Sequence, residues 1–170
     1  MGDKQSSNPD AHGFEPVDPW KSQYLGIRRR NLPHLVVPGA TYFITFRANI
    51  ELSPAARDVV IAIIHSNNQK SIDLDACVVM PDHAHFIFRP IEPHQLPQLL
   101  QRIKGRSARE INQMLKRGGS VWGDESFDHI IRHAEELAEK IEYIRNNPVK
   151  RGLVKHPEAY KWSLIKNITG

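Results

Sequence analysis

The sequence predicts an α+β domain in which an antiparallel sheet carries helices on one face. Apolar and polar residues alternate in short segments, as they do in strands, and apolar residues recur at three- and four-residue spacing in longer segments, as they do in helices. These segments follow one another as strand, helix, strand, strand, helix, strand, which is the order of the ferredoxin-like fold. Hydrophobic residues make up 40% of the 170 residues, enough for one core.

The first strand is expected at residues 40–48, which alternate and are rich in β-branched and aromatic side chains. Ser53 and Pro54 have the residue types of a helix N-cap and a first helical position, so a helix should run from there to about Asn67. Residues 71–80 should form the second strand. The apolar residues expected on one face of it are Ile72, Leu74, Ala76 and Val78.

A turn at Pro81 and Asp82 should reverse the chain into a third strand at residues 83–89, which pairs with the second as a hairpin. A long helix is then expected at about residues 96–115. Its apolar stripe comprises Leu96, Leu99, Leu100, Ile103, Ser107, Ile111 and Met114.

After an irregular start near residue 121, the chain should become extended again. A last helix is predicted from about Ala134 to Asn147, where Pro148 should stop it because proline has no N–H to donate. The remaining residues are expected to form a loop that packs Tyr160 and Trp162 onto the domain.

The composition narrows the class of protein. Residues 1–25 are rich in Pro, Ser, Asp and Gly and are expected to be a flexible leader, with residues 26–170 forming a single domain. The single cysteine, Cys77, excludes an internal disulfide and a cysteine-rich zinc site. No apolar run approaches the ~20 residues of a membrane helix, and no secretory signal pattern is present, so we expect a cytoplasmic, nucleoid-associated protein.

The basic residues are clustered, although the net charge is only +4. Clusters of this kind favour a polyanionic partner. The arginines and lysines expected to contact nucleic acid are Arg28, Arg29, Arg30, Arg102, Arg106, Arg109, Arg145, Lys150 and Arg151. For the three arginines of the long helix, the alternative is that they simply form a solvent-exposed helix face and bind no nucleic acid.

Two histidines, His83 and His85, begin the third strand. Residues two apart in a strand point to the same face, so both imidazoles should project together, while Ala84 and Phe86 point into the helix-covered core. Two adjacent imidazoles on an open sheet face suit a divalent metal ion. The alternative is that both histidines merely pack against the sheet.

Tyr143 lies on an unexpected side of the last helix. Ala134, Leu137, Ala138, Ile141 and Ile144 form one apolar stripe, and Tyr143 falls roughly opposite its centre, on the same side as Asn147. A core aromatic would not be placed there. Tyr143 is therefore a candidate nucleophile with a possible metal ligand four residues on, or else a surface tyrosine that packs under the tail.

Three motifs, PDHAHFIF (81–88), FDHIIR (127–132) and YIRNNPVKRGLV (143–154), resemble the REP-associated tyrosine transposases. These are single-tyrosine HUH nucleases related to insertion-sequence transposases, HUH denoting histidine, hydrophobic residue, histidine, here His83-Ala84-His85. The resemblance covers about Tyr42 to Trp162, and its most specific part is residues 143–154.

The resemblance implies a mechanism and a substrate. His83 and His85 would bind Mg²⁺ or Mn²⁺, and Tyr143 would attack the scissile phosphate of single-stranded DNA, leaving a 5′-phosphotyrosine and a free 3′-OH. The DNA would be a hairpin from a palindromic repeat. Insertion-sequence relatives have a glutamine ligand where this chain has Asn147.

His129 matches a histidine of the family pattern and is expected either near the site or in a hydrogen bond within the fold. Asp82 is expected to be a turn residue rather than a ligand. The tyrosine helix should lie against the open sheet face, either in its own chain or in a partner, so both a monomer and a homodimer are open.

Two other functional classes compete with this interpretation. One is a catalytically silent protein, derived from such a transposase, that binds hairpin DNA or RNA without cutting it. The other is a metal-dependent hydrolase, including a histidine-triad enzyme, although the triad would need a third histidine where Ile87 stands. A product covalently attached to the protein separates the transposase from both.

Overall fold

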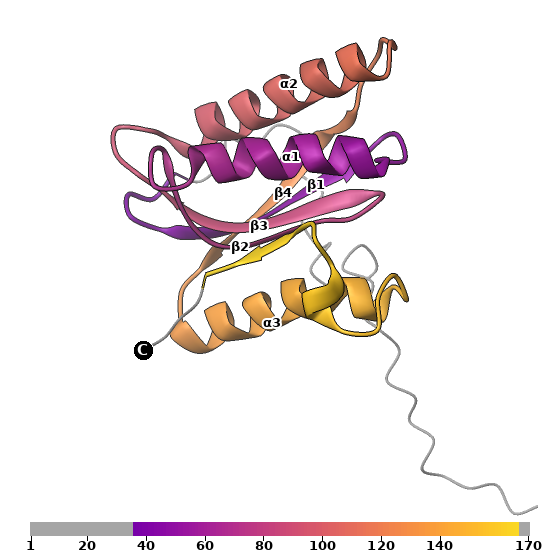
Figure 1. The fold of residues 1–170 in the computed structure, drawn as a ribbon. Coiled ribbons are helices and arrows are strands. Elements are labelled where there is room, and N and C mark those ends of the chain that lie inside the picture. Colours follow the sequence, from indigo (N-terminus) through magenta and orange to yellow (C-terminus); the bar gives the residue numbers. More distant parts are fainter. Residues whose placement is uncertain (1–35, 167–170) are drawn as a thin grey trace, which may run out of the picture. The chain divides into compact units, whose positions relative to one another are not determined.

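In the computed structural model, a five-stranded antiparallel sheet lies between two layers of helices (Figure 1). The structure describes residues 36–166, apart from the side chain of Glu125, and all of them lie in one compact unit. The predicted leader at residues 1–25 and the cluster Arg28, Arg29 and Arg30 lie outside the described residues. Within residues 36–166, no helix has both the length and the hydropathy that crossing a membrane requires.

The elements follow the predicted order, with two additions in the C-terminal segment, η2 and β5. They are β1 (Thr41–Ala48), α1 (Pro54–Asn67), β2 (Ile72–Val79), β3 (His83–Pro90), α2 (Leu96–Met114), β4 (Trp122–Ile131), α3 (Ala134–Lys150), the short 3₁₀ helix η2 (Pro157–Ala159) and β5 (Ser163–Ile165). The strands are arranged β4-β1-β3-β2-β5, so the first four have the ferredoxin-like order and β3 is central. The fold class predicted from the sequence is confirmed.

The two faces of the sheet carry different helices. On one face α1 and α2 cover the larger core, which includes Phe46, Phe86 and Phe88. On the other face α3 packs against β2, β3 and β5, and a smaller core forms there around Ile87, Ile141 and Ile144. As expected for the tyrosine helix, α3 lies on the face that α1 and α2 leave open (Figure 1).

The start of α1 follows its sequence signal. The Ser53 hydroxyl accepts a hydrogen bond from the Ala56 amide at 3.2 Å, and Pro54 occupies the first helical position. On α2 the expected stripe is buried from Leu96 to Ile111, but Met114 is 40% exposed. The assignment of Met114 to the stripe is wrong because the last turn of α2 extends beyond the core.

A β-bulge changes which face of β2 each residue occupies. Leu74 pairs with Phe88 and Ala76 pairs with Ile87, so Asp75 is an extra residue between them. Leu74 consequently belongs to the core under α1 and α2, whereas Ala76 belongs to the core under α3. The expectation that Ile72, Leu74, Ala76 and Val78 share one face is wrong for this reason.

Two C-terminal features also differ from expectation. α3 continues through Pro148 to Lys150, because in the last turn the missing proline N–H costs a single hydrogen bond. That turn is held by the Arg151 amide, which donates to the Asn147 carbonyl at 3.1 Å, and by the Leu153 amide, which donates to the Pro148 carbonyl at 2.9 Å. Beyond it, the predicted loop contains a fifth strand, β5, which pairs with β2.

The expected packing of the tail aromatics is present. The Tyr160 hydroxyl donates to the Val79 carbonyl at 2.8 Å, and Arg57 donates to the same hydroxyl at 3.0 Å. The Arg57 guanidinium lies 3.7 Å from the centre of the Trp162 ring, and the Trp162 indole donates to Asp58 at 2.8 Å. These contacts fasten the C-terminal segment to α1 and to the end of β2.

A buried hydroxyl explains the one polar residue in the α2 stripe and gives a test of the fold. Ser107 is fully buried and accepts the Trp122 indole N–H at 2.9 Å while donating to the Ile103 carbonyl at 2.7 Å. Ser107→Ala leaves that indole N–H buried without a partner, so we expect the free energy of unfolding to fall by about 1–3 kcal/mol in urea titrations. Ser66→Ala is the matched control, because the Ser66 hydroxyl bonds only to its own helix at Ile63. Equal losses in the two variants would contradict this role.

Candidate active site

His83 and His85 project from β3 toward α3, as the two-residue period predicts. They are 7% and 0% exposed, and their ring centres lie 4.6 Å apart. Ala84 and Phe86 point to the opposite core. The two imidazoles thus form an adjacent pair on the sheet face that α3 partly covers.

His85 is held by a hydrogen bond from the neighbouring strand. Its Nδ1 lies 2.8 Å from the Thr45 hydroxyl of β1, because Thr45 and His85 are directly paired across the two strands. Its other nitrogen, Nε2, is buried and has no hydrogen-bond partner among the described residues. Burial, together with the nearby His83 and Lys140, holds the pKa of His85 well below its usual value of 6.5. His85 is therefore held as a neutral imidazole, and its Nε2 atom is the one without a partner among the described residues.

His83 is oriented by a carboxylate rather than a hydroxyl. Its Nδ1 lies 2.7 Å from Asp82 Oδ1, and the second oxygen of Asp82 accepts a hydrogen bond from Arg151 at 3.1 Å. Partial burial opposes ionisation, but His83 and then Arg151 outweigh it and lower the pKa of the Asp82 carboxyl. A carboxylate only accepts, so Nδ1 of His83 carries a proton that points to Asp82. Asp82 is a turn residue, as expected, and also fixes the histidine.

Tyr143 stands directly over this pair. Its ring centre is 5.3 Å from that of His85 and 6.2 Å from that of Phe43, with the rings edge to face in both cases. The Lys150 ammonium lies 5.7 Å from the Tyr143 ring centre. The polar side of α3 that carries Tyr143 therefore faces β1 and β3 instead of solvent, and the chain's own tyrosine meets its own histidines.

Asn147, one turn beyond Tyr143, is turned inward. It is 6% exposed, and its side-chain oxygen Oδ1 is buried without a hydrogen-bond partner in the described part of the chain. The neighbouring Asn146 is used differently, because its amide donates to the Glu142 carbonyl at 3.0 Å within the helix. Of the two asparagines, Asn147 is the one whose oxygen is left for a ligand.

The side chains that meet here are of types that bind divalent cations. Two imidazole nitrogens and an amide oxygen would form a mixed set of donors for a divalent metal ion. Residues 36–166 contain no group of three or more His, Cys, Asp and Glu side chains arranged around one point, since the third candidate donor is an amide. An unpaired buried polar atom is costly in a fold, so the orphaned atoms of His85 and Asn147 are most simply explained by a ligand.

A sequence profile described as "Transposase IS200 like" matches residues 45–147, more than half of the chain, from Thr45 through the histidine pair to Asn147. The chain belongs to this IS200-like transposase family. It is 27% identical over 134 residues to a REP-associated tyrosine transposase of Escherichia coli (strain K12), an alignment that covers 75% of this chain and 77% of that protein. The family resemblance noted in the motifs is confirmed.

The fold comparison agrees with the profile. The chain matches a solved structure of a REP-associated tyrosine transposase bound to a REP hairpin with a TM-score of 0.67. The match has 23% sequence identity and covers 79% of this chain and 82% of that one. The open antiparallel sheet with its helices is therefore shared with that transposase.

His129 is engaged within the fold of this family member. Its Nε2 donates to Glu136 Oε1 at 2.5 Å, which ties β4 to the first turn of α3. The Arg132 amide and then His129 both stabilise the ionised carboxyl and lower the pKa of Glu136. Of the two roles considered for His129, the described contacts support the structural one.

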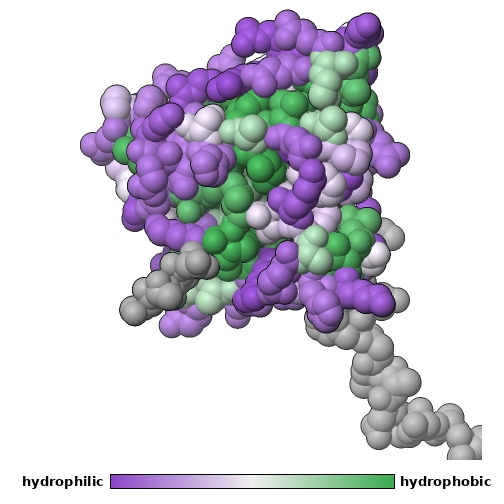
Figure 2. Space-filling view, viewed as in Figure 1, coloured by the Kyte–Doolittle hydropathy of each residue, from purple (hydrophilic) through white to green (hydrophobic). Residues whose placement is uncertain are grey.

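The predicted DNA-binding residues fall into separate groups. Arg102, Arg106 and Arg109 are exposed on α2, on the far side of the sheet from the histidines, where Figure 2 shows hydrophilic residues along the top of the view. Arg145 is paired with Glu142 and Glu158 on the outer side of α3. Of the predicted residues that the structure describes, only Lys150 and Arg151 adjoin the site, through Tyr143 and Asp82.

Sequence reasoning missed Thr45 and Phe43, which line the site from β1. Both lie on the histidine face, and Phe43 stacks on the His85 ring at a centre-to-centre distance of 5.2 Å. The Lys140 ammonium lies over the Phe43 ring, 5.2 Å from its centre. Alternation along residues 41–48 could have placed both on one face, but the pairing of Thr45 with His85 depends on cross-strand register.

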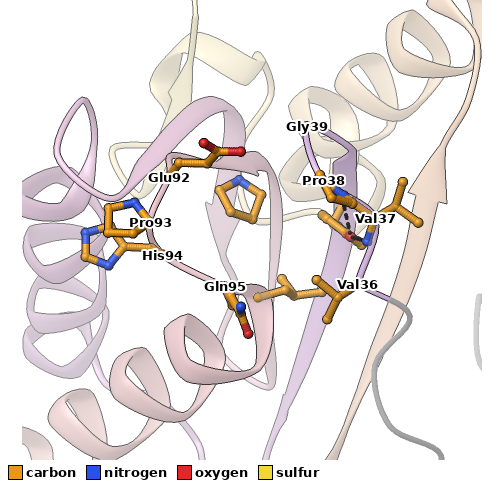
Figure 3. A pocket seen from close by; sticks show the side chains of 11 residues that line it. Val36, Val37, Pro38, Gly39, Glu92, Pro93, His94 and Gln95 are labelled. Atoms are coloured by element: carbon orange, nitrogen blue, oxygen red, sulfur yellow. Dashed lines mark hydrogen bonds between the residues drawn. The ribbon is translucent and has the colours of Figure 1, made fainter.

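A separate cavity of about 280 Å³ lies away from the histidines. Figure 3 shows residues 36–39 and 92–95 on either side of it, and the Tyr42 hydroxyl accepts the Val37 amide there at 2.8 Å. Tyr42 and Leu96, which also line it, belong to the core under α1 and α2. The candidate active site is therefore on the opposite face of the sheet from this cavity.

The unpaired oxygen of Asn147 gives a stability test. Asn147→Leu replaces a buried polar group by an apolar one of similar size, so we expect the free energy of unfolding of chelator-treated protein to rise by about 1 kcal/mol. Asn146→Leu, which removes a hydrogen bond on the same helix, should give no gain. A loss of stability in Asn147→Leu, measured by chemical denaturation, would show that its oxygen is satisfied in the folded protein.

Proposed function

We propose that this protein is a metal-dependent single-stranded DNA endonuclease and strand transferase that acts on hairpin-forming repeats through a 5′-phosphotyrosine intermediate. The observation that carries the proposal is the 5.3 Å separation of the Tyr143 and His85 ring centres within one chain. The solved relative that shares its fold is bound to a REP hairpin, which supports a hairpin from a palindromic repeat as the DNA partner.

His83, His85 and Asn147 would hold the Mg²⁺ or Mn²⁺ ion. When bound, the ion would polarise the scissile phosphate and offset the charge that develops in the transition state. Thr45 and Asp82 keep the two imidazoles turned so that their Nδ1 atoms are engaged within the protein. The neutral state of His85 matches the requirement that a ligating imidazole be unprotonated.

Tyr143 would perform the covalent step. Its phenolic oxygen bonds to phosphorus, the bond from phosphorus to the 3′ oxygen breaks, and the 3′ oxygen takes up a proton while the phenol gives one up. Because one phosphodiester replaces another, the reverse attack by a 3′-OH rejoins the strand without ATP. Lys150, beside the Tyr143 ring, places a positive charge where phosphate and phenolate would both be negative.

The covalent intermediate is the direct test. We expect labelled single-stranded hairpins from the repeats that flank the gene to give a protein-linked band on a denaturing gel when Mn²⁺ or Mg²⁺ is added. Tyr143→Phe and His83→Ala should both remove the band, because one lacks the nucleophile and the other a metal ligand. Asn146→Ala should retain it, since its amide bonds within α3.

The other outcomes of this assay are equally informative. Cleaved DNA with no attached protein would assign the chain to the metal-dependent hydrolases instead. Tight hairpin binding without any adduct, across the repeat sequences tested, would establish a binding protein derived from a transposase.

Metal binding has its own measurement, independent of cleavage. We expect the wild-type protein to bind Mn²⁺, which can be followed by electron paramagnetic resonance of the free ion. His85→Ala should abolish this binding. Thr45→Val should weaken the affinity by about 10–100-fold, because it removes the partner that orients His85. His65→Ala, an exposed histidine of α1, is the control and should bind as the wild type does. Retention of affinity in His85→Ala would refute the site.

A further inference from the structure

An exposed aromatic side chain lies on the same sheet face as the histidine pair. Phe127 of β4 pairs with Thr45 of β1, and Thr45 pairs in turn with His85 of β3. The three residues therefore form one row across the sheet. Unlike the other two, which are 3% and 0% exposed, Phe127 is 41% exposed.

Phe127 is exposed because of where α3 sits. The helix packs against β2, β3 and β5, and it reaches β4 through the hydrogen bond between Glu136 and His129. His129 pairs with Phe43, and this pair lies two residues along the strands from the pair of Phe127 and Thr45. The part of the face around Phe127 consequently stays accessible beside the site.

Single exposed apolar residues are common on protein surfaces and need no special explanation. Phe127 differs from Met114, which is 40% exposed at the end of α2, in its surroundings. Arg47, the next residue of β1 on this face, is exposed and pairs with His83. Lys140 and Lys150 lie across the site on α3, against Phe43 and Tyr143. An accessible ring on an open sheet face, with Arg47 on the neighbouring strand and two lysines on the helix across the site, suits a strand with flat bases and negative phosphates.

The chemistry distinguishes unpaired from paired DNA. Bases of a single strand stack on aromatic rings presented by a sheet face, whereas bases within a duplex are already stacked on one another. Neighbouring strands lie about 4.8 Å apart, so two strand spacings put Phe127 about 10 Å from His85. A short run of extended nucleotides spans that distance from a phosphate held at the histidines.

We propose that Phe127 is a stacking platform for the base of an unpaired nucleotide close to the scissile phosphate. The inference rests on the proposed function for its substrate, single-stranded DNA beside a hairpin stem. Stacking tolerates any base, so Phe127 would hold the single strand in position over the site without reading its sequence.

The test measures binding separately from cleavage. In a Tyr143→Phe background, hairpins with an unpaired flank carry 2-aminopurine at one flank position at a time, and blunt hairpins of the same stem serve for comparison. We expect one position to be quenched on binding. Phe127→Ala should abolish that quenching and weaken binding of the flanked hairpin by about 5- to 150-fold, with blunt hairpins changed less than about twofold. Phe127→Trp should restore both signals.

Met114→Ala is the control, because it removes another exposed apolar side chain, from the helix layer on the opposite face of the sheet. It should change neither the quenching nor the affinity. Because Phe127 is exposed, thermal unfolding of Phe127→Ala should match that of the parent protein. Unchanged quenching and affinity in Phe127→Ala would overturn the inference, and so would an equal loss of affinity for flanked and blunt hairpins.

The two proposals fail in different ways. If the wild type forms the covalent adduct but Phe127→Ala binds flanked hairpins normally, the stacking role is wrong and the nuclease stands. If no adduct forms but quenching still depends on Phe127, the stacking role stands on a protein that binds single strands without cutting them.

Discussion

The packing of α3 against the second face of the sheet is the contact on which the site depends. Ile141 and Ile144 enter the smaller core with Val78 and Ile87, and burying each such side chain contributes about 1.5–3 kcal/mol. This contact also sets the rotation of α3 about its axis. Tyr143 precedes Ile144 by one residue, or about 100° of helix, which turns it from the β2 side toward Phe43 and His85.

The site combines tight positioning with unsatisfied polarity. Thr45 and Asp82 each bond to one nitrogen of a histidine, so the His85 ring is fixed from the neighbouring strand and the His83 ring from the turn before it. The remaining buried atoms, Nε2 of His85 and Oδ1 of Asn147, have no partner among the described residues. Folding alone would favour apolar groups there. Buried polar atoms that lower stability, in the middle of an otherwise well-packed face, are typical of binding or catalytic sites.

How much of the fold and the site could be predicted from the sequence depends on whether each interaction lies within one element or joins two elements. The shared face of His83 and His85, and the shared side of Tyr143 and Asn147 on α3, depend on periods within one element, and the sequence contains those periods. The bulge at Asp75 could not be seen, because Leu74-Asp75-Ala76 continues the expected alternation while the extra residue appears only in the pairing with β3. The polar side of α3 was identified, but its burial against β1 and β3 is a tertiary effect. The hydrogen bond from His129 to Glu136 likewise joins two elements.

The short connection into α3 limits what the helix can do. β4 ends at Ile131 and α3 begins at Ala134, and a chain segment of that length spans about 10 Å at full extension. At its other end, η2 leads into β5, which pairs with β2 and forms one edge of the sheet. Both ends of α3 are therefore connected to strands of the sheet against which it packs. Exchanging α3 with a second subunit would require an edge strand to leave the sheet. The connectivity therefore favours an arrangement in which Tyr143 faces the histidines of its own chain.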